Sequence, residues 1–483
     1  MNPNLNAPEK NLNTPLADAV EGPIIVGLDI GTTKIAVFVA RRNKYGKLHI
    51  MGMGRADSNG GVMRGEVVNV ERTTQAIVKA VAIAEQQAKV KIRSVFVGIA
   101  GSHIQCRQNP GVIGLGAPDT EVTREHVQRM FDDIRNVALP PGERIIQISP
   151  QEYKIDDLIG IVDPIGHFGS RMETNFNIIT GKITAALYIQ RCIQRAGLHM
   201  EDLYLEPLAS SAAVLTEQEK EAGVVLVDIG GGTTDIAIFK EGILRYTGVI
   251  PLAGNIITED IKEGCKVLRK EAELMKTKHG SALPDALSGN QIISIPGIEG
   301  RKVREVSVKT LSDIINARME EIFDQVYLHI QRSGYAQKII AGVVVTGGGS
   351  QLKYLTQMIE YSLGMSTRIG YPSVHTASDT KPEWKSPMYA TGIGLVLNGF
   401  DFMELLPAQQ ADMFSCVEQL SPTLPQVEIK ETAEKPTSGP GDEKDKQDEK
   451  KIVIPQQHSI RGSIISSLKK WFDDDQVNGD FDK

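Results

Sequence analysis

The sequence predicts an α/β protein made of two related halves. Segments with strand character alternate with amphipathic helical segments over most of the chain, which is the pattern of mixed α/β folds. The 483 residues also exceed what one core usually fills. Finally, VGLDIGTTKIAVFV (26–39) and VLVDIGGGTTDIAIF (225–239) align closely if the second has two extra residues in its turn. Both are strand, Asp-Ile-Gly, Thr-Thr, strand, and such a repeat indicates a duplicated fold.

The order of elements follows from the spacing of apolar residues, which alternates in strands and recurs every three to four residues in helices. In the first half we expect two strands joined by a Gly-Thr turn, a third strand, a helix, extended structure, a helix that ends before Pro140, more extended structure, and a helix closed by Gly197. The corresponding ranges are 23–42, 47–58, 67–90, 94–109, 123–139, 144–156 and 185–200.

The second half repeats the strand–turn–strand unit. This unit lies at 223–242, and we expect a long helix, a buried strand and a final helix after it, at 311–334, 339–352 and 386–400. After Phe402 the composition becomes rich in Pro, Glu, Lys, Asp and Gly and nearly lacks aromatic residues. Because such a segment cannot bury enough apolar surface to offset the entropy of ordering, we expect a disordered acidic linker there.

The composition excludes several classes of function. A net charge of −7 argues against nucleic acid as the main partner, because binding to phosphates needs a basic face. The cysteines, Cys106, Cys192, Cys265 and Cys416, lack the spacing of a zinc site, so we expect free thiols in a reducing cytoplasm. The polar residues 1–22 lack the apolar centre of a signal peptide, and no apolar run approaches the roughly 18–20 residues that span a bilayer. We expect a cytoplasmic body with at most peripheral membrane contact.

The tip of each strand–turn–strand unit suits phosphate groups. A tight turn at Gly31, Thr32 and Thr33 exposes backbone N–H groups, because glycine permits left-handed backbone and close approach, and the hydroxyls add donors. Lys34 follows this tip and can add a point charge. The second unit has a similar tip with two more glycines.

Three carboxylates flank the tips. Asp29 and Asp228 end the first strands of their units, where a carboxylate can hold Mg²⁺ through water. Asp235 follows the second tip and can orient a metal-bound or attacking water. Singly, these features favour plainer interpretations: an ordinary hairpin, an ordinary strand–helix turn, or a carboxylate that faces solvent. Together and in this order, DIGTTK, EPLAS, DIGGGTTD and TGGGS favour nucleotide binding.

This set of motifs resembles the two phosphate loops, the connecting segment and the adenosine loop of the actin-like ATPases, a superfamily that includes actin, heat-shock chaperones, sugar kinases and bacterial division and shape proteins. The resemblance implies two α/β domains that close on ATP and Mg²⁺. It assigns to the first phosphate loop Asp29, Gly31, Thr32, Thr33 and Lys34; to the second Asp228, Gly230, Gly231, Gly232, Thr233, Thr234 and Asp235; and to the adenosine loop Gly347, Gly348, Gly349 and Ser350.

The resemblance also implies roles for four residues outside these loops. Glu206, in EPLAS, matches a glutamate with which several relatives position the attacking water, so Glu206 and Asp235 are the candidate catalytic residues. Gly254 belongs to the matching stretch GVIPLAGNIITEDI. Glu273 and Lys276 lie where relatives contact the ribose and adenine, although a helical Glu/Lys pair three residues apart is usually a surface ion pair.

Within the superfamily, the chain is most similar to the FtsA family of bacterial cell-division proteins. The stretches AGSHIQC, PQEYKID, LASSAAVLTEQEKEAGVVLVDIGGGTTDIAIF and VVVTGGGSQL occur in that family's order, and the resemblance covers roughly residues 23–400. Residues 94–181 match the subdomain that this family inserts after the first helix. In that insert we interpret His103 as a hydrogen-bonded core or turn histidine rather than a catalytic one.

The resemblance divides the chain into subdomains that this family names 1A, 1C, 2A and 2B. The predicted ranges are a disordered N-terminus, 1–22; subdomain 1A, 23–93 and 182–208, with its C-terminal helix at 386–402; the inserted subdomain 1C, 94–181; subdomain 2A, 209–264 and 321–385; subdomain 2B, 265–320; the acidic linker, 403–458; an amphipathic helix, 459–472; and an acidic tail, 473–483.

By the same resemblance, the protein binds ATP, self-associates into actin-like filaments and anchors the tubulin-like protein FtsZ to the inner face of the cytoplasmic membrane at the division site, where it recruits later division proteins. The FtsZ C-terminal peptide would bind subdomain 2B. The rate of ATP hydrolysis stays open, because relatives range from fast to barely active and Glu206 alone does not decide it. We expect slow or regulated ATPase activity at most.

The segment SIRGSIISSLKKWF (459–472) has the pattern of an amphipathic membrane helix. Its apolar residues recur at helical spacing and its basic residues lie off or at the edge of that stripe, which suits anionic lipid. The alternative is a helix that docks on the body or on a partner. The predicted membrane-binding residues are Ile460, Ile464, Ile465, Leu468, Lys469, Lys470, Trp471 and Phe472.

Two other functions use the same superfold. A small-molecule kinase would need a substrate pocket and a general base between its domains, and the sequence has no separate motif for either. A heat-shock chaperone would need a β-rich peptide-binding domain after the ATPase, where the acidic linker lies instead. The membrane-bound division protein is therefore the favoured function.

Overall fold

The computed structural model describes residues 22–287, 291–295, 303–404 and 415–419. The chain divides into units 1–422 and 423–483, so every described residue belongs to the first unit. The predicted N-terminal segment, the amphipathic helix and the acidic tail lie outside the described residues. No helix among the described residues has the length and apolar character needed to cross a membrane.

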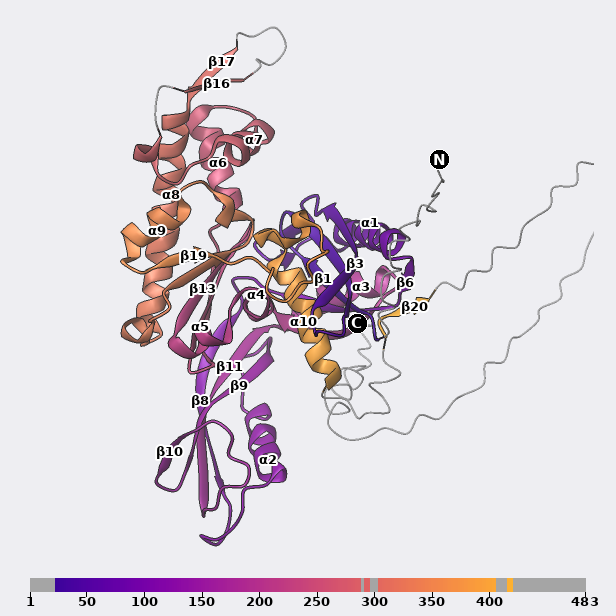
Figure 1. Cartoon of the computed structure of the whole chain (residues 1–483), viewed down its shortest axis with the longest axis vertical. Coiled ribbons are helices and arrows are strands. Elements are labelled where there is room, and N and C mark those ends of the chain that lie inside the picture. The colour runs from indigo at the N-terminus through magenta and orange to yellow at the C-terminus, as the bar shows by residue number, and fades with distance from the viewer. Residues whose placement is uncertain (1–21, 288–290, 296–302, 405–414, 420–483) are drawn as a thin grey trace, which may run out of the picture. The chain divides into compact units, whose positions relative to one another are not determined.

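The first half contains a five-stranded sheet in the order β12-β7-β1-β2-β3 (Figure 1). The β1–β2 and β2–β3 pairs are antiparallel, and β7 and β12 add in parallel. The helices α1 and α10 approach this sheet closely where it has glycine: a Cβ on Gly54 would lie 1.8 Å from Ala80 O in α1. The elements are β1 Ile25–Ile30, β2 Lys34–Arg42, β3 Leu48–Asp57, α1 Val70–Ala88, β7 Ser94–Ile99, α3 Ile183–Arg195, β12 His199–Leu205, α4 Glu206–Val214 and α10 Ala390–Glu404.

The second half repeats this sheet in the order β15-β14-β13-β18-β19, again with two antiparallel pairs followed by two parallel ones. The equivalence of β1–β2 and β13–β14 confirms the predicted duplication. The two extra residues predicted for the second turn are wrong, because Ile30 pairs with Ile35 and Ile229 with Thr234, so that both turns have the same length. Its helices and the hairpin β16–β17 enclose a second core. The elements are α5 Glu217–Ala222, β13 Val224–Ile229, β14 Thr234–Lys240, β15 Ile243–Ile250, α6 Gly254–Cys265, α7 Arg269–His279, β16 Ile292–Ile295, β17 Arg304–Ser307, α8 Val308–Arg332, β18 Val343–Thr346, α9 Leu355–Leu363 and β19 Thr367–Ile369. Helix α8 runs unbroken across the predicted boundary at 320–321.

The insert is a separate antiparallel sheet, β10-β9-β11-β8, with α2 packed against it. It has its own core, in which Phe131 and Phe176 meet edge to face with ring centres 5.3 Å apart. The predicted core histidine, His103, is buried at its base, and burial lowers the pKa of its imidazole. The prediction that it is hydrogen-bonded is wrong, because neither ring nitrogen has a hydrogen-bond partner among the described residues. The elements are β8 Gln105–Gly114, α2 Arg124–Arg135, β9 Glu143–Ile155, β10 Leu158–Ile161 and β11 Arg171–Lys182.

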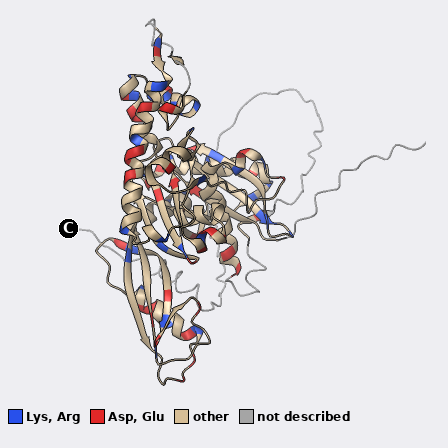
Figure 2. Cartoon of the chain, turned by 60° about the vertical axis from the view of Figure 1, so that its left-hand side comes forward, with Lys and Arg blue, Asp and Glu red and all other residues tan. Residues whose placement is uncertain are grey.

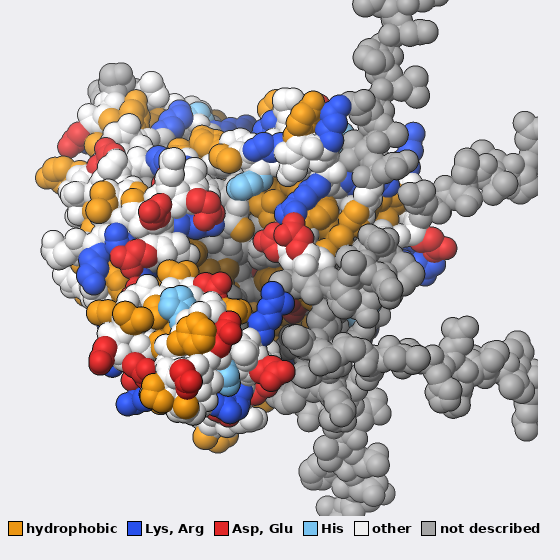
Figure 3. All heavy atoms as spheres, turned by 60° about the horizontal axis from the view of Figure 1, so that its bottom comes forward, with side chains coloured by type: hydrophobic (Ala, Val, Ile, Leu, Met, Phe, Trp, Pro, Cys, Tyr) orange, Lys and Arg blue, Asp and Glu red, His pale blue; other side chains and the backbone are white. Residues whose placement is uncertain are grey.

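The surface of the described residues carries mixed charge. In Figure 2 ribbon segments coloured for basic and for acidic residues alternate along the helices of the second half. The end of the insert that carries β10 differs because it exposes large apolar side chains, and Figure 3 shows hydrophobic groups among acidic ones there. The exposed apolar residues of this end are Leu158, Ile159, Val162, Ile165 and Phe168.

The predicted acidic linker needs a correction at two places. Residues 403 and 404 continue α10, and Val417–Gln419 form strand β20, which pairs antiparallel with β6 (Val90–Ile92). The physical reason is Cys416, whose side chain is buried and whose carbonyl accepts hydrogen bonds from the N–H groups of Arg93 and Ser94. One apolar residue that fits the core edge was enough to order a segment of linker composition.

Candidate functional site

A cavity of about 420 Å³ opens between the two hairpin tips and is closed by α6, α7 and the turn after β18. Most of the predicted site residues line it, although they come from six separate stretches of the sequence. They are Asp29, Gly31, Thr32, Thr33, Lys34, Glu206, Asp228, Gly230, Gly231, Gly232, Thr233, Asp235, Gly254, Glu273, Lys276, Gly347, Gly348 and Gly349.

The first tip is a closed turn with one cation. Gly31 N–H donates to Lys34 O at 3.0 Å, which joins the ends of β1 and β2 around Thr32 and Thr33. Lys34 Nζ lies 2.8 Å from Asp29 Oδ2, and both side chains are largely buried. The tip therefore presents an ammonium group and backbone to the cavity, with Asp29 partly neutralised.

The second tip repeats the turn without the cation. Gly230 N–H donates to Thr233 O at 2.9 Å, and helix α6 begins directly on this tip, where Gly254 N–H donates to Gly230 O at 3.1 Å. This places the N-terminal end of α6, with its positive partial charge, on the cavity wall. Phosphate oxygens would meet a favourable field from both sides.

The two tips touch, and their glycines are required for that contact. A Cβ on Gly231 would lie 2.6 Å from Thr33 Oγ1, and one on Gly232 would lie 2.4 Å from Thr32 Oγ1 and 2.9 Å from the backbone of Arg64. None of the tip glycines has a positive φ. The prediction that they serve left-handed backbone is therefore wrong, and close approach is the reason for them.

The turn after β18 closes the cavity on the far side of Asp228. Gly347 has φ +82°, and a Cβ there would lie 2.3 Å from Asp228 Oδ1 and 2.5 Å from Ile229 O. Gly348 has open space around its Cβ position. Gly347 must therefore be glycine, because of both its backbone conformation and its close contacts, whereas Gly348 has room for a Cβ.

Hydrogen-bonded polar side chains join α6 to α7 on the wall of the cavity where the resemblance places the nucleoside. Lys276 Nζ donates to Glu273 Oε2 (2.7 Å), Thr258 Oγ1 (2.7 Å) and Gly254 O (2.8 Å). Burial lowers the pKa of Lys276, while Glu273 raises it. The ion pair expected from the spacing does form, but the Lys276 side chain is largely buried and the pair is a hydrogen-bonded part of the cavity wall.

Two carboxyl groups that line the cavity, Glu206 and Asp235, have pKa values above their usual range. The pKa of Glu206 is raised well above its usual value, first by burial and then by Asp29, Asp235 and Asp228. Burial also raises the pKa of Asp235 to about 8, with repulsion from Asp228 added. These groups therefore hold protons more tightly than ordinary carboxyls unless a positive charge is supplied.

The donor set fits a hydrated divalent cation. Asp29 and Asp228 both line the cavity, and Asp235 Oδ1 is buried without a hydrogen-bond partner. In the described part of the chain, no three or more His, Cys, Asp or Glu side chains are arranged to ligate a metal. One or two carboxylates with water and substrate phosphates are the usual environment of Mg²⁺, so the residues present are compatible with it.

Two predicted residues do not reach the cavity. Thr234 Oγ1 donates to Leu252 O at 2.8 Å, because it points away from the cavity that its strand neighbours Thr233 and Asp235 line. Ser350 is fully buried and donates to Gly347 O at 2.8 Å, so it holds the turn from behind. The predicted membrane-binding residues 460–472 lie outside the described residues.

Other residues of the site were missed by sequence reasoning. Ser210 Oγ donates to Asp228 Oδ2 at 2.5 Å, and Thr391 Oγ1 reaches the same oxygen at 3.4 Å. Ser210 stands in the EPLAS motif, so its place on α4 was a usable signal. Thr391 had none, because α10 reaches the site from 163 residues away. Arg55 and Gly65, on neighbouring strands and turns, also line the cavity.

Two family models match the chain. One, described as "Cell division protein FtsA", matches residues 225–394, and the other, "SHS2 domain inserted in FTSA", matches residues 101–180. The second range corresponds to the insert that contains β8–β11.

Known proteins give the same result over about four fifths of this chain. The chain is 39% identical to cell division protein FtsA of Pseudomonas aeruginosa over 385 residues, which cover 80% of this chain and 91% of that protein. It is 34% identical to cell division protein FtsA of Escherichia coli over 389 residues, which cover 79% of this chain and 91% of that protein.

Among solved structures, the chain is similar to one titled "PilM-PilN type IV pilus biogenesis complex", with a TM-score of 0.58 and 16% identity, over 78% of this chain and 98% of that chain. At this identity the likeness concerns the fold alone. The predicted fold class, an actin-like ATPase fold with an inserted subdomain, is confirmed.

Proposed function

The chain belongs to the FtsA family of cell-division proteins, and from that premise we propose that it binds ATP in the cavity between its two hairpin tips and acts as an actin-like cytoskeletal protein at the division site. The observation that carries the proposal is the contact between the two tips, which brings Lys34, the N-terminus of α6 and two sets of backbone N–H groups around one cavity. These are groups that bind phosphate.

Each wall of the cavity has a separate role in this proposal. The tips hold the phosphate chain, with Lys34 contributing its charge, while Glu273, Lys276 and the turn at Gly347 contact the nucleoside. Asp29 and Asp228 would hold Mg²⁺ through water, and Mg²⁺ supplies positive charge to the phosphates. Glu206 and Asp235 orient a water, and burial raises the pKa of both carboxyl groups. Slow or regulated ATPase activity at most is expected.

The proposal extends to partners through the family and the tail. We propose that subdomain 2B, with α7 and the β16–β17 hairpin, binds the C-terminal peptide of FtsZ, that the protein forms filaments, and that the helix at 459–472 attaches these to anionic lipids on the cytoplasmic face of the membrane. What supports the last step is the helical spacing of apolar residues and the flanking lysines. A single helix binds reversibly, and filament formation would strengthen attachment through avidity.

Sedimentation with vesicles of anionic phospholipid tests this function. The protein should pellet with the vesicles, more strongly with Mg²⁺ and ATP than without, and should carry purified FtsZ with it. Trp471→Glu should reduce pelleting to the level of a vesicle-free control, because it places a charge on the apolar stripe, while ATP binding stays normal. Unchanged pelleting of this variant would refute the membrane helix. If the protein pellets but the added FtsZ stays in the supernatant, the proposal that the protein anchors FtsZ is refuted.

A further inference from the structure

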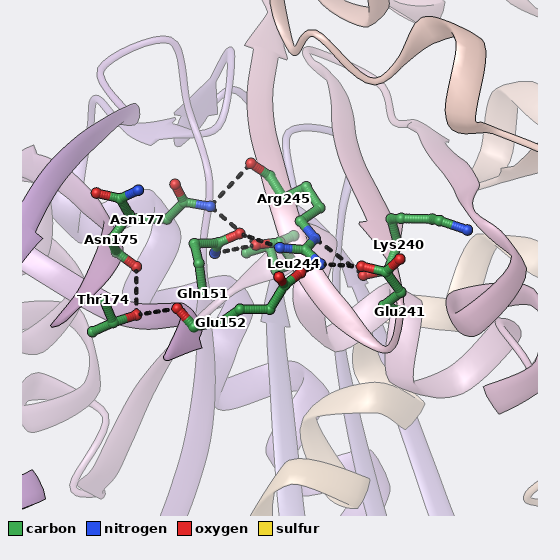
Figure 4. Close-up of polar contacts among 9 residues, drawn as sticks. All are labelled: Gln151, Glu152, Thr174, Asn175, Asn177, Lys240, Glu241, Leu244 and Arg245. Atoms are coloured by element: carbon green, nitrogen blue, oxygen red, sulfur yellow. Dashed lines mark hydrogen bonds and ion pairs between the residues drawn. The ribbon is translucent and has the colours of Figure 1, made fainter. Parts of the chain in front are cut away.

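The insert contacts the second half at the edge of its sheet. Asn177 Nδ2 in β11 donates to the carbonyl oxygens of Leu244 and Arg245 in β15, both at 3.0 Å, and Gln151 Nε2 in β9 donates to Leu244 O at 2.9 Å (Figure 4). Asn177 and Gln151 are buried. Because β15 is an edge strand, these side-chain amides supply partners that a further strand would otherwise provide.

A buried arginine holds the same contact by charge. The Arg245 side chain is 5% exposed, and its Nη2 lies 2.6 Å from Glu241 Oε2 and also contacts Glu152. Its Nε donates to Lys240 O at 3.1 Å. Glu152 belongs to the insert and Glu241 to the turn between β14 and β15, so one cation joins carboxylates from two bodies (Figure 4). The hydrogen bond from Arg245 is the main cause that lowers the pKa of Glu152.

This contact lies at the opposite end of the hairpin that carries the second tip. Strand β14 starts directly after Thr233 and ends at Lys240, next to the turn that holds Glu241. Its seven residues pair with β13 and β15 along its length, and at roughly 3.3 Å per residue they span about 20 Å. A strand paired on both sides moves as one piece, so the tip and the Arg245 cluster are rigidly connected.

The chain itself connects the insert to the first half. It enters from β7 and leaves into α3, and both of these elements belong to the first core. The insert is thus joined to one half by two chain segments and to the other by an ionic cluster whose arginine is buried and whose carboxylates are partly exposed. Because separating the insert would take a charge partner away from the buried Arg245, the cluster should persist when the halves move.

We propose that Arg245 clamps the insert to the β14–β15 hairpin, so that the insert moves with the second half and pivots on its two connections to the first half. A nucleotide that draws the second tip toward the first would then turn the insert. This consequence depends on the proposed ATP binding, whereas the clamp does not. Closure of two domains around a ligand commonly rotates whatever is fixed to one of them.

Distances between paired spin labels test the clamp. One label at Asp157→Cys reports the insert, and its partner is either Lys79→Cys on α1 or Tyr361→Cys on α9, all on exposed positions. Cys106→Ala in every variant leaves the other native cysteines buried. In the parent protein, Mg²⁺ and ATP should shift the 157–79 distance and leave the 157–361 distance unchanged.

Arg245→Met removes the charge and keeps the bulk. It should broaden the 157–361 distribution before any nucleotide is added and abolish the ATP-dependent shift of the 157–79 distance. The matched control Arg171→Met, on β11, removes an exposed ion pair with Glu173 and should behave as the parent. If Arg245→Met does not fold, Glu152→Gln removes the charge from the insert side and should broaden the same distribution to a smaller extent.

Three results would overturn the proposal: an unbroadened 157–361 distribution in folded Arg245→Met, an ATP-dependent shift in the 157–361 rather than the 157–79 distance, or no shift in either despite ATP binding. Calorimetry of ATP binding to the parent protein distinguishes failure of the clamp proposal from failure of the proposed function. If no ATP binds to the parent protein, the proposed function fails, the coupling to nucleotide fails with it, and the nucleotide-free comparison of Arg245→Met with Arg171→Met decides the clamp.

Discussion

The two hairpin tips have the same backbone and opposite electrostatics. In the first, Lys34 neutralises Asp29 at 2.8 Å. In the second, Asp228 accepts hydrogen bonds from Ser210 and Thr391, and Asp235 from Thr233, so hydroxyl groups take the place of a cation. Duplication thus supplied the same turn twice. The residues around the first turn provide a lysine, whereas those around the second provide carboxyl groups that can bind a proton or a metal ion.

The largest effect should come from filling the turn behind the second tip. Gly347→Ala forces a side chain onto Asp228 and Ile229 at a positive φ, and should lower the free energy of unfolding by about 2–4 kcal/mol. Gly348→Ala, one residue on, should change it by less than about 0.5 kcal/mol, because its Cβ meets open space. Urea denaturation measures both. Equal losses would mean that Gly347 does not brace Asp228.

The second test removes the charge that distinguishes the first tip. Lys34→Met should weaken ATP binding by about tenfold to a hundredfold, because it deletes a charge-assisted contact and leaves Asp29 unpaired. Thr233→Val, which removes a hydroxyl at the second tip, should weaken it by less than about tenfold. Calorimetric titration measures both. A larger loss at Thr233 than at Lys34 would reverse the assignment of roles.

A smaller effect, which grows as the pH rises, concerns the second tip. Because folding raises the pKa of Asp235 from about 4 to about 8, the folded state binds more protons than the unfolded state between these values, and stability falls as the pH rises through that window. Asp235→Asn removes this loss, so it should stabilise the nucleotide-free protein by about 1 kcal/mol or more at pH 8 and less at pH 6. Asp157→Asn, at an exposed turn, is the control. Thermal unfolding at both pH values measures the difference, and an effect independent of pH would contradict it.

The sequence predicted the site well because its motifs lie at strand ends, and strand ends of a duplicated sheet meet at one place. The error at Thr234 was avoidable, since side chains alternate along a strand and Asp235 had already been assigned to the cavity. The contact of Thr391 with Asp228 was not predictable, because nothing local in α10 signals it. The same holds for Arg245, whose partners come from the insert, and for Cys416, a single apolar residue inside a segment of linker composition.

The central claim is that the two tips bind one phosphate chain between them. Titration of the protein with ATP and Mg²⁺ in a calorimeter, beside the Gly231→Asp variant, tests it directly. The side chain of the variant would overlap Thr33 and its charge would face the phosphates, so ATP affinity should fall by at least about a hundredfold while the parent protein binds. Equal affinities for the two proteins, or no binding to the parent, would contradict the account.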